Sequence, residues 1–226
     1  MAAERIPGRY RFWRGAIRGL LLILCRLRVE GAERVPRQGP LIILANHLHW
    51  LDPPVLLATM PTRVRVLAAE KWEQRPIINR LFKAVDAVFI NRAGADLGAL
   101  RQVEELLRQG ATFGIAPEGT RSKTGGLQQG KGGAALLASR TGATLIPVVA
   151  YGQERVFTEL RRLRRAEVVV RVGEPFTLPA PTGAGRSRQL EAMTEEIMLR
   201  IARLLPPAYR GIYGPAVAEE ERSVAQ

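Results

Sequence analysis

Cysteine is nearly absent from this chain of 226 residues, which contains only Cys25. A single cysteine excludes an internal disulfide, a cysteine zinc cluster and an iron–sulfur site, and it makes a reducing compartment the default expectation. Long apolar runs are also missing, because the most apolar stretch, Gly19 to Cys25, is far shorter than the ~20 residues of a membrane-spanning helix. The sequence therefore predicts no single spanning helix, and its length suits one domain.

Acidic residues are few relative to basic ones. The chain has 21 aspartates and glutamates against 34 lysines and arginines, a formal net charge of +13, which indicates an anionic partner. Aromatic residues make up only 6% of the chain, and the arginine clusters are mostly flanked by aliphatic residues. The stacking face of a nucleic-acid-binding module is thus lacking, and we expect no nucleic-acid partner.

Residues 1–28 have the pattern of an amphipathic helix, with an apolar stripe and a basic stripe at helical spacing. The apolar stripe is Trp13, Ile17, Leu20, Leu24 and Leu27, and the basic one is Arg11, Arg14 and Arg18. A basic helix with a tryptophan suits the interface of an anionic bilayer, and the same pattern suits a helix that packs on a core with a solvated basic face. Residues 160–165, where leucines interrupt a run of arginines, suit a second contact with anionic headgroups, and they equally suit a solvated loop or helix face.

Beyond residue 28, short β-rich apolar runs alternate with helical patterns, which predicts an α/β domain with a mostly parallel central sheet flanked by helices. We expect an N-terminal helix over 1–28, one domain over 29–205, and an irregular tail over 206–226. The expected strands are Leu41–Ala45, Val64–Ala69, Ala87–Asn91, Thr112–Ala116, Thr144–Ala150 and Glu167–Val172. The expected helices are Pro53–Met60, Glu73–Lys83, Asp96–Arg108 and Gly132–Ser139, with a last one striped by Leu190, Met193, Ile197, Ile201 and Leu204.

Polar residues follow four of the expected strands, at the edge where open α/β sheets bind their ligands. The segments are Asn46–Asp52, Glu70–Lys71, Asn91–Arg92 and Pro117–Ser122. Together they supply a base, an acid and several cations to one edge of the sheet.

The first segment holds both histidines of the chain, which favours a functional loop. Asp52 precedes Pro53 and an apolar helical run, so it resembles a helix N-cap, and an ionised carboxylate there can also orient His47. The spacing of His47, His49 and Asp52 superficially resembles a zinc site. With no third histidine and one cysteine, we expect no metal.

The glycine-rich segment Gly125–Gly132 matches a phosphate-binding loop except at its last position. Gly132 replaces the magnesium-binding hydroxyl, and no strand precedes the segment, so nucleotide hydrolysis is not expected. Gly130 and Lys131 are predicted instead to begin a helix.

Four blocks of the sequence carry a resemblance to a known family. They are Asn46-His47 with Asp52, then Phe89-Ile90-Asn91-Arg92, then Phe113 to Ser122 with its Pro-Glu-Gly-Thr-Arg-Ser core, then Leu145-Ile146-Pro147-Val148. In this order and at these separations, over about residues 29–175, they resemble the 1-acylglycerol-3-phosphate acyltransferase family. The implied fold is that of the glycerol-3-phosphate acyltransferases.

The resemblance implies a role for each block. His47 would be the general base for an acceptor hydroxyl, and Asp52 would orient it. The acceptor's glycerol phosphate would be bound by Arg92 of the second block and by Glu118, Gly119, Thr120 and Arg121 of the third, with Lys71 as a further phosphate contact. Pro147 would shape the acyl or donor site. The structural alternatives to these roles are that Arg92 and Arg121 are solvated surface residues and that Glu118 forms an ion pair with a neighbouring arginine.

The expected function is acylation of the sn-2 hydroxyl of lysophosphatidic acid by acyl-CoA or acyl carrier protein, giving phosphatidic acid without a cofactor. The alternatives are another lysophospholipid, glycerol-3-phosphate or a glycolipid as the acceptor, and a catalytically silent membrane scaffold. A lipid acceptor implies peripheral or monotopic binding to an anionic membrane surface, on the cytoplasmic face of the cell membrane. The sequence does not give the oligomeric state.

Overall fold

The computed structural model of the chain describes residues 6–70, 74, 79–80, 82–83, 85–90 and 97–224. The strands are β1 (Cys25–Glu30), β2 (Leu41–Ala45), β3 (Val64–Ala69), β4 (Val88–Ile90), β5 (Thr112–Ile115), β6 (Thr144–Tyr151) and β7 (Ala166–Val172). The α-helices are α1 (Gly8–Leu24), α2 (Asp52–Thr59), α4 (Leu97–Arg108), α5 (Gly133–Thr141), α6 (Val156–Arg161), α7 (Arg186–Leu204) and α8 (Gly214–Val224). Most of the helix expected over Glu73–Lys83 lies outside the described residues.

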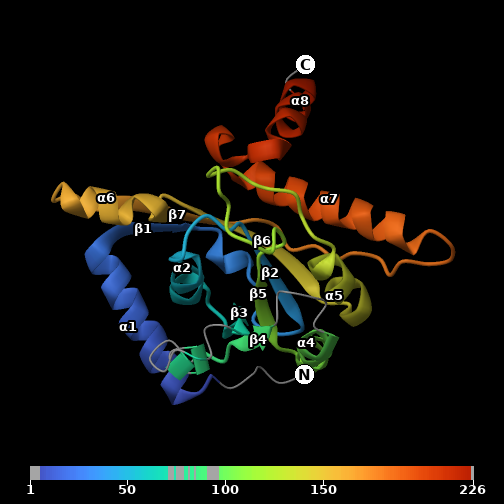
Figure 1. The fold of residues 1–226 in the computed structure, drawn as a ribbon, viewed down its shortest axis with the longest axis horizontal. Coiled ribbons are helices and arrows are strands. Elements are labelled where there is room, and N and C mark those ends of the chain that lie inside the picture. Colours follow the sequence, from blue (N-terminus) through green and yellow to red (C-terminus); the bar gives the residue numbers. More distant parts are fainter. Residues whose placement is uncertain are drawn as a thin grey trace.

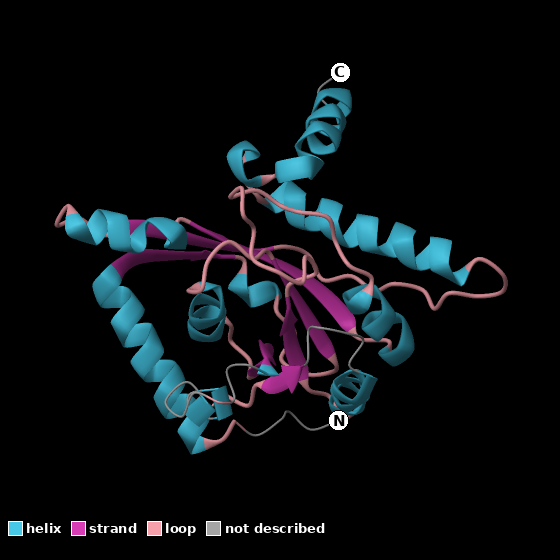
Figure 2. Cartoon of the chain, viewed as in Figure 1, coloured by secondary structure: helices cyan, strands magenta, loops and turns pink. Residues whose placement is uncertain are grey.

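The strands form one seven-stranded sheet in the order β1-β7-β6-β2-β5-β3-β4. Every pairing is parallel except that of β6 with β7. Helices cover both faces of the sheet, as Figures 1 and 2 show. The expected single α/β domain with a mostly parallel sheet is therefore confirmed.

The sheet separates two apolar cores, one on each face. One core joins buried residues of α1 and α2 to the sheet, among them Tyr10 and Val55. The other joins α4, α5 and α7 to the opposite face, among them Leu107 and Ile197. Strand β2 contributes to both cores, because Ile42 and Ile43 point to opposite faces and both are fully buried.

The N-terminal helix ends at Leu24, earlier than the residue 28 expected from the pattern. Residues Cys25–Glu30 instead form β1, the edge strand that pairs with β7. The alternation of exposed and half-buried side chains explains the difference. Arg26 and Arg28 are exposed while Leu27 between them is half-buried, which is the pattern of a strand. The helix itself packs firmly: the Tyr10 hydroxyl donates to the Val64 carbonyl at 3.2 Å and accepts from the Val64 N–H at 2.9 Å.

Residues 206–224 are ordered, contrary to the expected irregular tail. Helix α8 packs against the core through Val217, while Tyr213 just before it is also buried. Two acidic residues of the segment pair with arginines. Glu220 pairs with Arg203 at 2.8 Å, and Glu221 forms a bidentate ion pair with Arg210 at 2.6 and 3.0 Å. The sequence pattern favoured an irregular tail, whereas these contacts join the segment to the rest of the fold.

Candidate functional site

Three neighbouring strands bring the polar segments together. Strand β2 lies between β6 and β5 and is parallel to both, so the carboxyl ends of all three meet at one edge of the sheet. His47 follows β2, Glu118 follows β5 and Gln153 follows β6. The chain thus places a base, a buried acid and a buried amide from segments far apart in sequence at one location.

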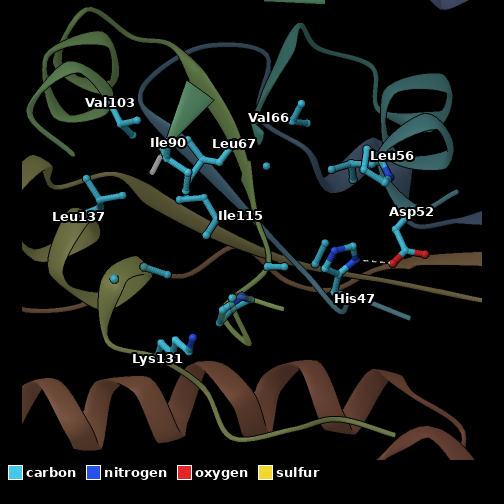
Figure 3. Close-up of a pocket in the computed structure, with 18 of the residues that line it drawn as sticks. His47, Asp52, Leu56, Val66, Leu67, Ile90, Val103, Ile115, Lys131 and Leu137 are labelled. Carbon is cyan, nitrogen blue, oxygen red and sulfur yellow. Dashed lines mark hydrogen bonds and ion pairs between the residues drawn. The ribbon is translucent and has the colours of Figure 1, made fainter. Parts of the chain in front are cut away.

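His47 and Asp52 form a close pair at this edge (Figure 3). The imidazole Nδ1 lies 2.7 Å from Asp52 Oδ2, and the Asp52 residue is 8% exposed. Because the carboxylate accepts a hydrogen bond from Nδ1, the other ring nitrogen, Nε2, keeps its lone pair free to take a proton from a substrate. An imidazole held in this way can serve as a general base.

Two further N–H groups hold the Asp52 carboxylate in place. The backbone N–H of His49 donates to Oδ2 at 2.8 Å, and Gln153 Nε2 donates to Oδ1 at 2.8 Å. Asp52 is also the first residue of α2, with Pro53 directly after it, so its carboxylate lies at the positive end of the helix dipole. Gln153 is fully buried and was missed by sequence reasoning, although its place just after an apolar strand was a usable signal.

Glu118 ties the loops of the site together. Its Oε1 accepts from the His47 N–H at 2.9 Å and its Oε2 from the Gln128 N–H at 3.0 Å. Burial raises the pKa of Glu118, and these two backbone hydrogen bonds act in the opposite direction. Both oxygens thus accept hydrogen bonds from the protein's own backbone, and Glu118 holds the backbone of His47 in position.

Of the other predicted site residues of the third block, only Gly119 lines the cavity beside His47. Gly119 has a φ of 68°, a conformation that favours glycine. Thr120 and Arg121 are exposed. The positive charge of Arg121 contributes to lowering the pKa of His49, after the larger effect of burial. Lys71 and Arg92 lie outside the described residues.

His49 belongs to a different cluster from His47. Its ring lies 5.4 Å from the ring of Trp50 and 6.4 Å from that of Phe157. Within the described part of the chain, no group of three or more histidine, cysteine, aspartate or glutamate side chains is arranged to hold a metal ion.

An apolar cavity of about 580 Å³ extends from the His47–Asp52 pair between the sheet and the helices, a size typical of small-molecule sites. Its far walls are aliphatic, as Figure 3 shows, and they include Leu67, Val103, Ile115 and Leu137. Its polar lining residues include His47, Asp52 and Lys131. Pro147 is buried in β6 and is not among the residues that line the cavity.

Comparison with known proteins gives a consistent result. The family model for acyltransferases matches residues 26–151. The 1-acyl-sn-glycerol-3-phosphate acyltransferase of Borreliella burgdorferi is 29% identical over 134 residues, which are 58% of this chain and 54% of that protein. The Bacillus subtilis protein of the same name is 26% identical over 196 residues, covering 86% of this chain and 96% of that protein.

The fold also matches a solved structure. The crystal structure of the 1-acyl-sn-glycerophosphate (LPA) acyltransferase PlsC from Thermotoga maritima aligns with a TM-score of 0.63 and 26% sequence identity. The alignment covers 83% of this chain and 78% of that chain. This chain spans about half the length of the Borreliella protein and nearly all of the Bacillus protein.

Proposed function

Because the chain belongs to the acyltransferase family, we propose that it transfers a fatty acyl group from an acyl thioester to the sn-2 hydroxyl of lysophosphatidic acid, giving phosphatidic acid. The observation that carries the proposal is the His47–Asp52 pair, joined at 2.7 Å, at the mouth of an apolar cavity. The named relatives are 1-acyl-sn-glycerol-3-phosphate acyltransferases, which supports this substrate class.

The reaction follows from the geometry of the pair. His47 Nε2 takes the proton of the acceptor hydroxyl as its oxygen attacks the thioester carbonyl, forming a tetrahedral intermediate. The intermediate collapses, the carbon–sulfur bond breaks, and the departing thiolate takes the proton from the imidazolium. Asp52 stabilises that imidazolium, and Gln153 holds Asp52 in the required orientation. No redox step occurs, so the reaction requires no redox cofactor.

The two substrates divide the site between them. The aliphatic walls of the cavity suit the acyl chain, because apolar surface is favourably removed from water there. For the acceptor's phosphate we propose a subsite formed by the exposed Thr120 and Arg121 together with Gly119, Glu118, Lys71 and Arg92. The donor is acyl-CoA or acyl carrier protein, both of which present the acyl group as a thioester.

Helix α4 provides a test of the acyl-chain assignment. Leu100 lines the cavity, whereas Leu107, two turns further along the same helix, is buried outside it. Leu100→Phe is expected to shift the donor preference to shorter chains, by roughly fourfold for each methylene that the cavity no longer holds, since each buried methylene is worth about 0.8 kcal/mol. The measurement is kcat/KM across a series of acyl thioesters of increasing length.

Leu107→Phe is the matched control. It enlarges the same side chain on the same helix and is expected to lower stability by about 1–3 kcal/mol without changing the chain-length profile. If both variants left the profile unchanged, the acyl chain would lie elsewhere.

We further propose that an anionic membrane surface is the partner of the face formed by α1 and the tip of α6. Apolar side chains of α1 remain exposed there, including Ile23 at 71%, and Leu163 beyond α6 is 97% exposed. Arg165 donates to the Leu22 and Cys25 carbonyls, which fixes this tip against the end of α1 (Figure 1). Exposed leucines and isoleucine beside a run of arginines suit the bilayer interface.

The described residues include no helix that combines the length and the apolarity needed to cross a bilayer. We therefore propose peripheral or monotopic attachment through the α1 and α6 face, on the cytoplasmic side of the cell membrane.

A charge placed on this face should weaken membrane binding. Ile23→Asp is expected to reduce partitioning onto anionic vesicles by roughly tenfold or more, because full burial of such a side chain is worth about 1.5–3 kcal/mol. Sedimentation with vesicles containing phosphatidylglycerol measures the effect. Ile212→Asp is the control, because Ile212 has a similar exposure of 63% but lies next to Tyr213, which belongs to the core on the opposite face of the sheet. Equal binding by the Ile23→Asp variant and the unmodified protein would exclude this face.

The activity itself is tested by thiol release from an acyl thioester, with acyl-CoA and acyl carrier protein as donors. Release is expected to depend on added lysophosphatidic acid and to exceed that with glycerol-3-phosphate, other lysophospholipids or a glycolipid. Acceptor-independent release would contradict the proposal because it would indicate hydrolysis of the thioester. Absent release would contradict it in favour of a catalytically silent scaffold.

A further inference from the structure

We propose that Lys131 binds the phosphate monoester of the acceptor, as a cation of the acceptor subsite that the family blocks do not include. This inference rests on the proposed function. The sequence pattern around Lys131 mimics a nucleotide phosphate loop and fails at its last position, so the lysine had no assigned role. Its position in the fold supplies one.

Lys131 lines the cavity that contains His47 and Asp52, just before the start of α5 (Figure 3). Among the described residues lining the cavity, it is the one lysine or arginine. No carboxylate of the described chain pairs with its ammonium: the oxygens of Asp52 and Glu118 accept hydrogen bonds from other groups. The ammonium therefore keeps its three N–H donors for a ligand.

The lysine is held over the glycine of the third block. A Cβ on Gly119 would lie 3.0 Å from Cδ and 3.1 Å from Nζ of Lys131, closer than side chains normally approach. A glycine at this position therefore makes room for the lysine side chain as well as adopting a positive φ. The Lys131 ammonium thus lies beside Gly119. The preceding residue, Glu118, accepts a hydrogen bond from the backbone N–H of His47.

The backbone of Lys131 is also fixed. Its N–H donates to the Pro117 carbonyl at 2.8 Å. The preceding Gly130 packs so closely on α7 that a Cβ there would lie 2.6 Å from Cγ of Met198. Lys131 is consequently held at one place relative to His47 by the turn after β5 and by α7.

A phosphate monoester fits this cation better than the reacting carbonyl does. It carries close to two negative charges at neutral pH, and ammonium groups bind phosphate as compact point charges. Lys131 is exposed to solvent, which suits a charged headgroup at the cavity mouth, whereas stabilisation of an oxyanion depends on exclusion of water. Bound there, the phosphate would hold the glycerol hydroxyl near His47 while the chain of the donor occupies the aliphatic part of the cavity.

The kinetic test uses Lys131→Gln, which keeps most of the length of the side chain and removes its charge. The KM for lysophosphatidic acid is expected to rise roughly tenfold to a hundredfold, the value of a charge-assisted hydrogen bond, with the KM for the thioester donor unchanged. Lys131→Arg should restore most of the affinity. With monoacylglycerol, an acceptor without phosphate, the variant and the unmodified enzyme should behave alike.

Lys123→Gln is the matched control, because Lys123 is an exposed lysine of the same loop that does not line the cavity. An unchanged KM for lysophosphatidic acid in Lys131→Gln would overturn the proposal. So would a rise in the donor KM instead, or a fall in kcat alone, since these would assign the lysine to the donor's phosphate or to the reacting carbonyl.

A binding measurement separates this inference from the proposed function. Calorimetric titration with glycerol 3-phosphate needs no turnover, and the heat of binding is expected for the unmodified protein and lost in Lys131→Gln. Equal binding by both proteins would overturn the inference even if the enzyme acylates lysophosphatidic acid. Lack of acyl transfer together with Lys131-dependent binding would overturn the proposed function alone.

Discussion

His47→Ala is expected to lower kcat/KM for lysophosphatidic acid by at least about 10²- to 10⁴-fold, the usual contribution of a general base. The fold should survive, because the contacts of His47 with neighbouring loops are made by its backbone. Its N–H donates to Glu118 and its carbonyl accepts from the Ser122 N–H at 2.7 Å, and alanine keeps both. Thiol-release kinetics and a thermal melt of each variant measure the two effects.

The other histidine of the chain is the control for this variant. His49→Ala removes an imidazole from the same loop, but that ring packs with Trp50 and Phe157 while the His49 backbone keeps its hydrogen bond to Asp52. Its effect on kcat should be much smaller. Near-normal transfer by His47→Ala, or an equal loss in His49→Ala, would show that His47 is not the base.

Asp52→Asn is expected to lower kcat by about 10²- to 10⁴-fold with a smaller change in KM. The reason is that an amide, unlike the carboxylate it replaces, neither stabilises the imidazolium nor fixes the ring tautomer. The substitution keeps the shape of the side chain. It also weakens the hydrogen bonds that Asp52 accepts from His49 and Gln153. Steady-state kinetics at saturating donor separate the loss in kcat from any change in KM.

Asp86→Asn makes the same chemical change away from the site. Asp86 pairs with Arg9 and Arg63 at 2.7 Å, and its φ of 56° is one that asparagine accommodates. This variant should retain normal kcat. If Asp52→Asn stayed within about threefold of the unmodified enzyme, well below the effect of a tautomer-fixing carboxylate, Asp52 would have a structural role alone, as the first residue of α2 rather than the N-cap expected from the sequence.

The sequence predicted well the edge of the sheet where His47 and Glu118 lie, because buried parallel strands appear in a sequence as clear apolar runs. The strands Leu41–Ala45 and Val64–Ala69 were expected with the bounds that the structure has. The expectation that Glu118 lies on the same side of the molecule as His47 is also met, since the two are hydrogen-bonded. Arg92, which was expected on the same side as His47, lies outside the described residues. Membership of the acyltransferase family, expected from the four blocks, is confirmed.

Features that depend on tertiary contacts could not be predicted in the same way. Strand β1 was taken as helix because Leu24 and Leu27 continue a helical stripe, and only the partner β7 decides in favour of a strand. The hydrogen bond from Gln153 to Asp52 joins residues 101 apart in sequence. The cavity and the seat of Lys131 on Gly119 likewise exist only after the helices and the sheet have packed together.

The central claim is that this site transfers an acyl group to the sn-2 hydroxyl of lysophosphatidic acid. The most direct measurement supplies a donor with a labelled acyl chain and 1-acyl lysophosphatidic acid, then treats the product with a phospholipase specific for the sn-2 ester. The account predicts labelled phosphatidic acid whose label is released entirely as free fatty acid, and no such product from His47→Ala. Label in any other lipid, or label that resists the phospholipase, would contradict it.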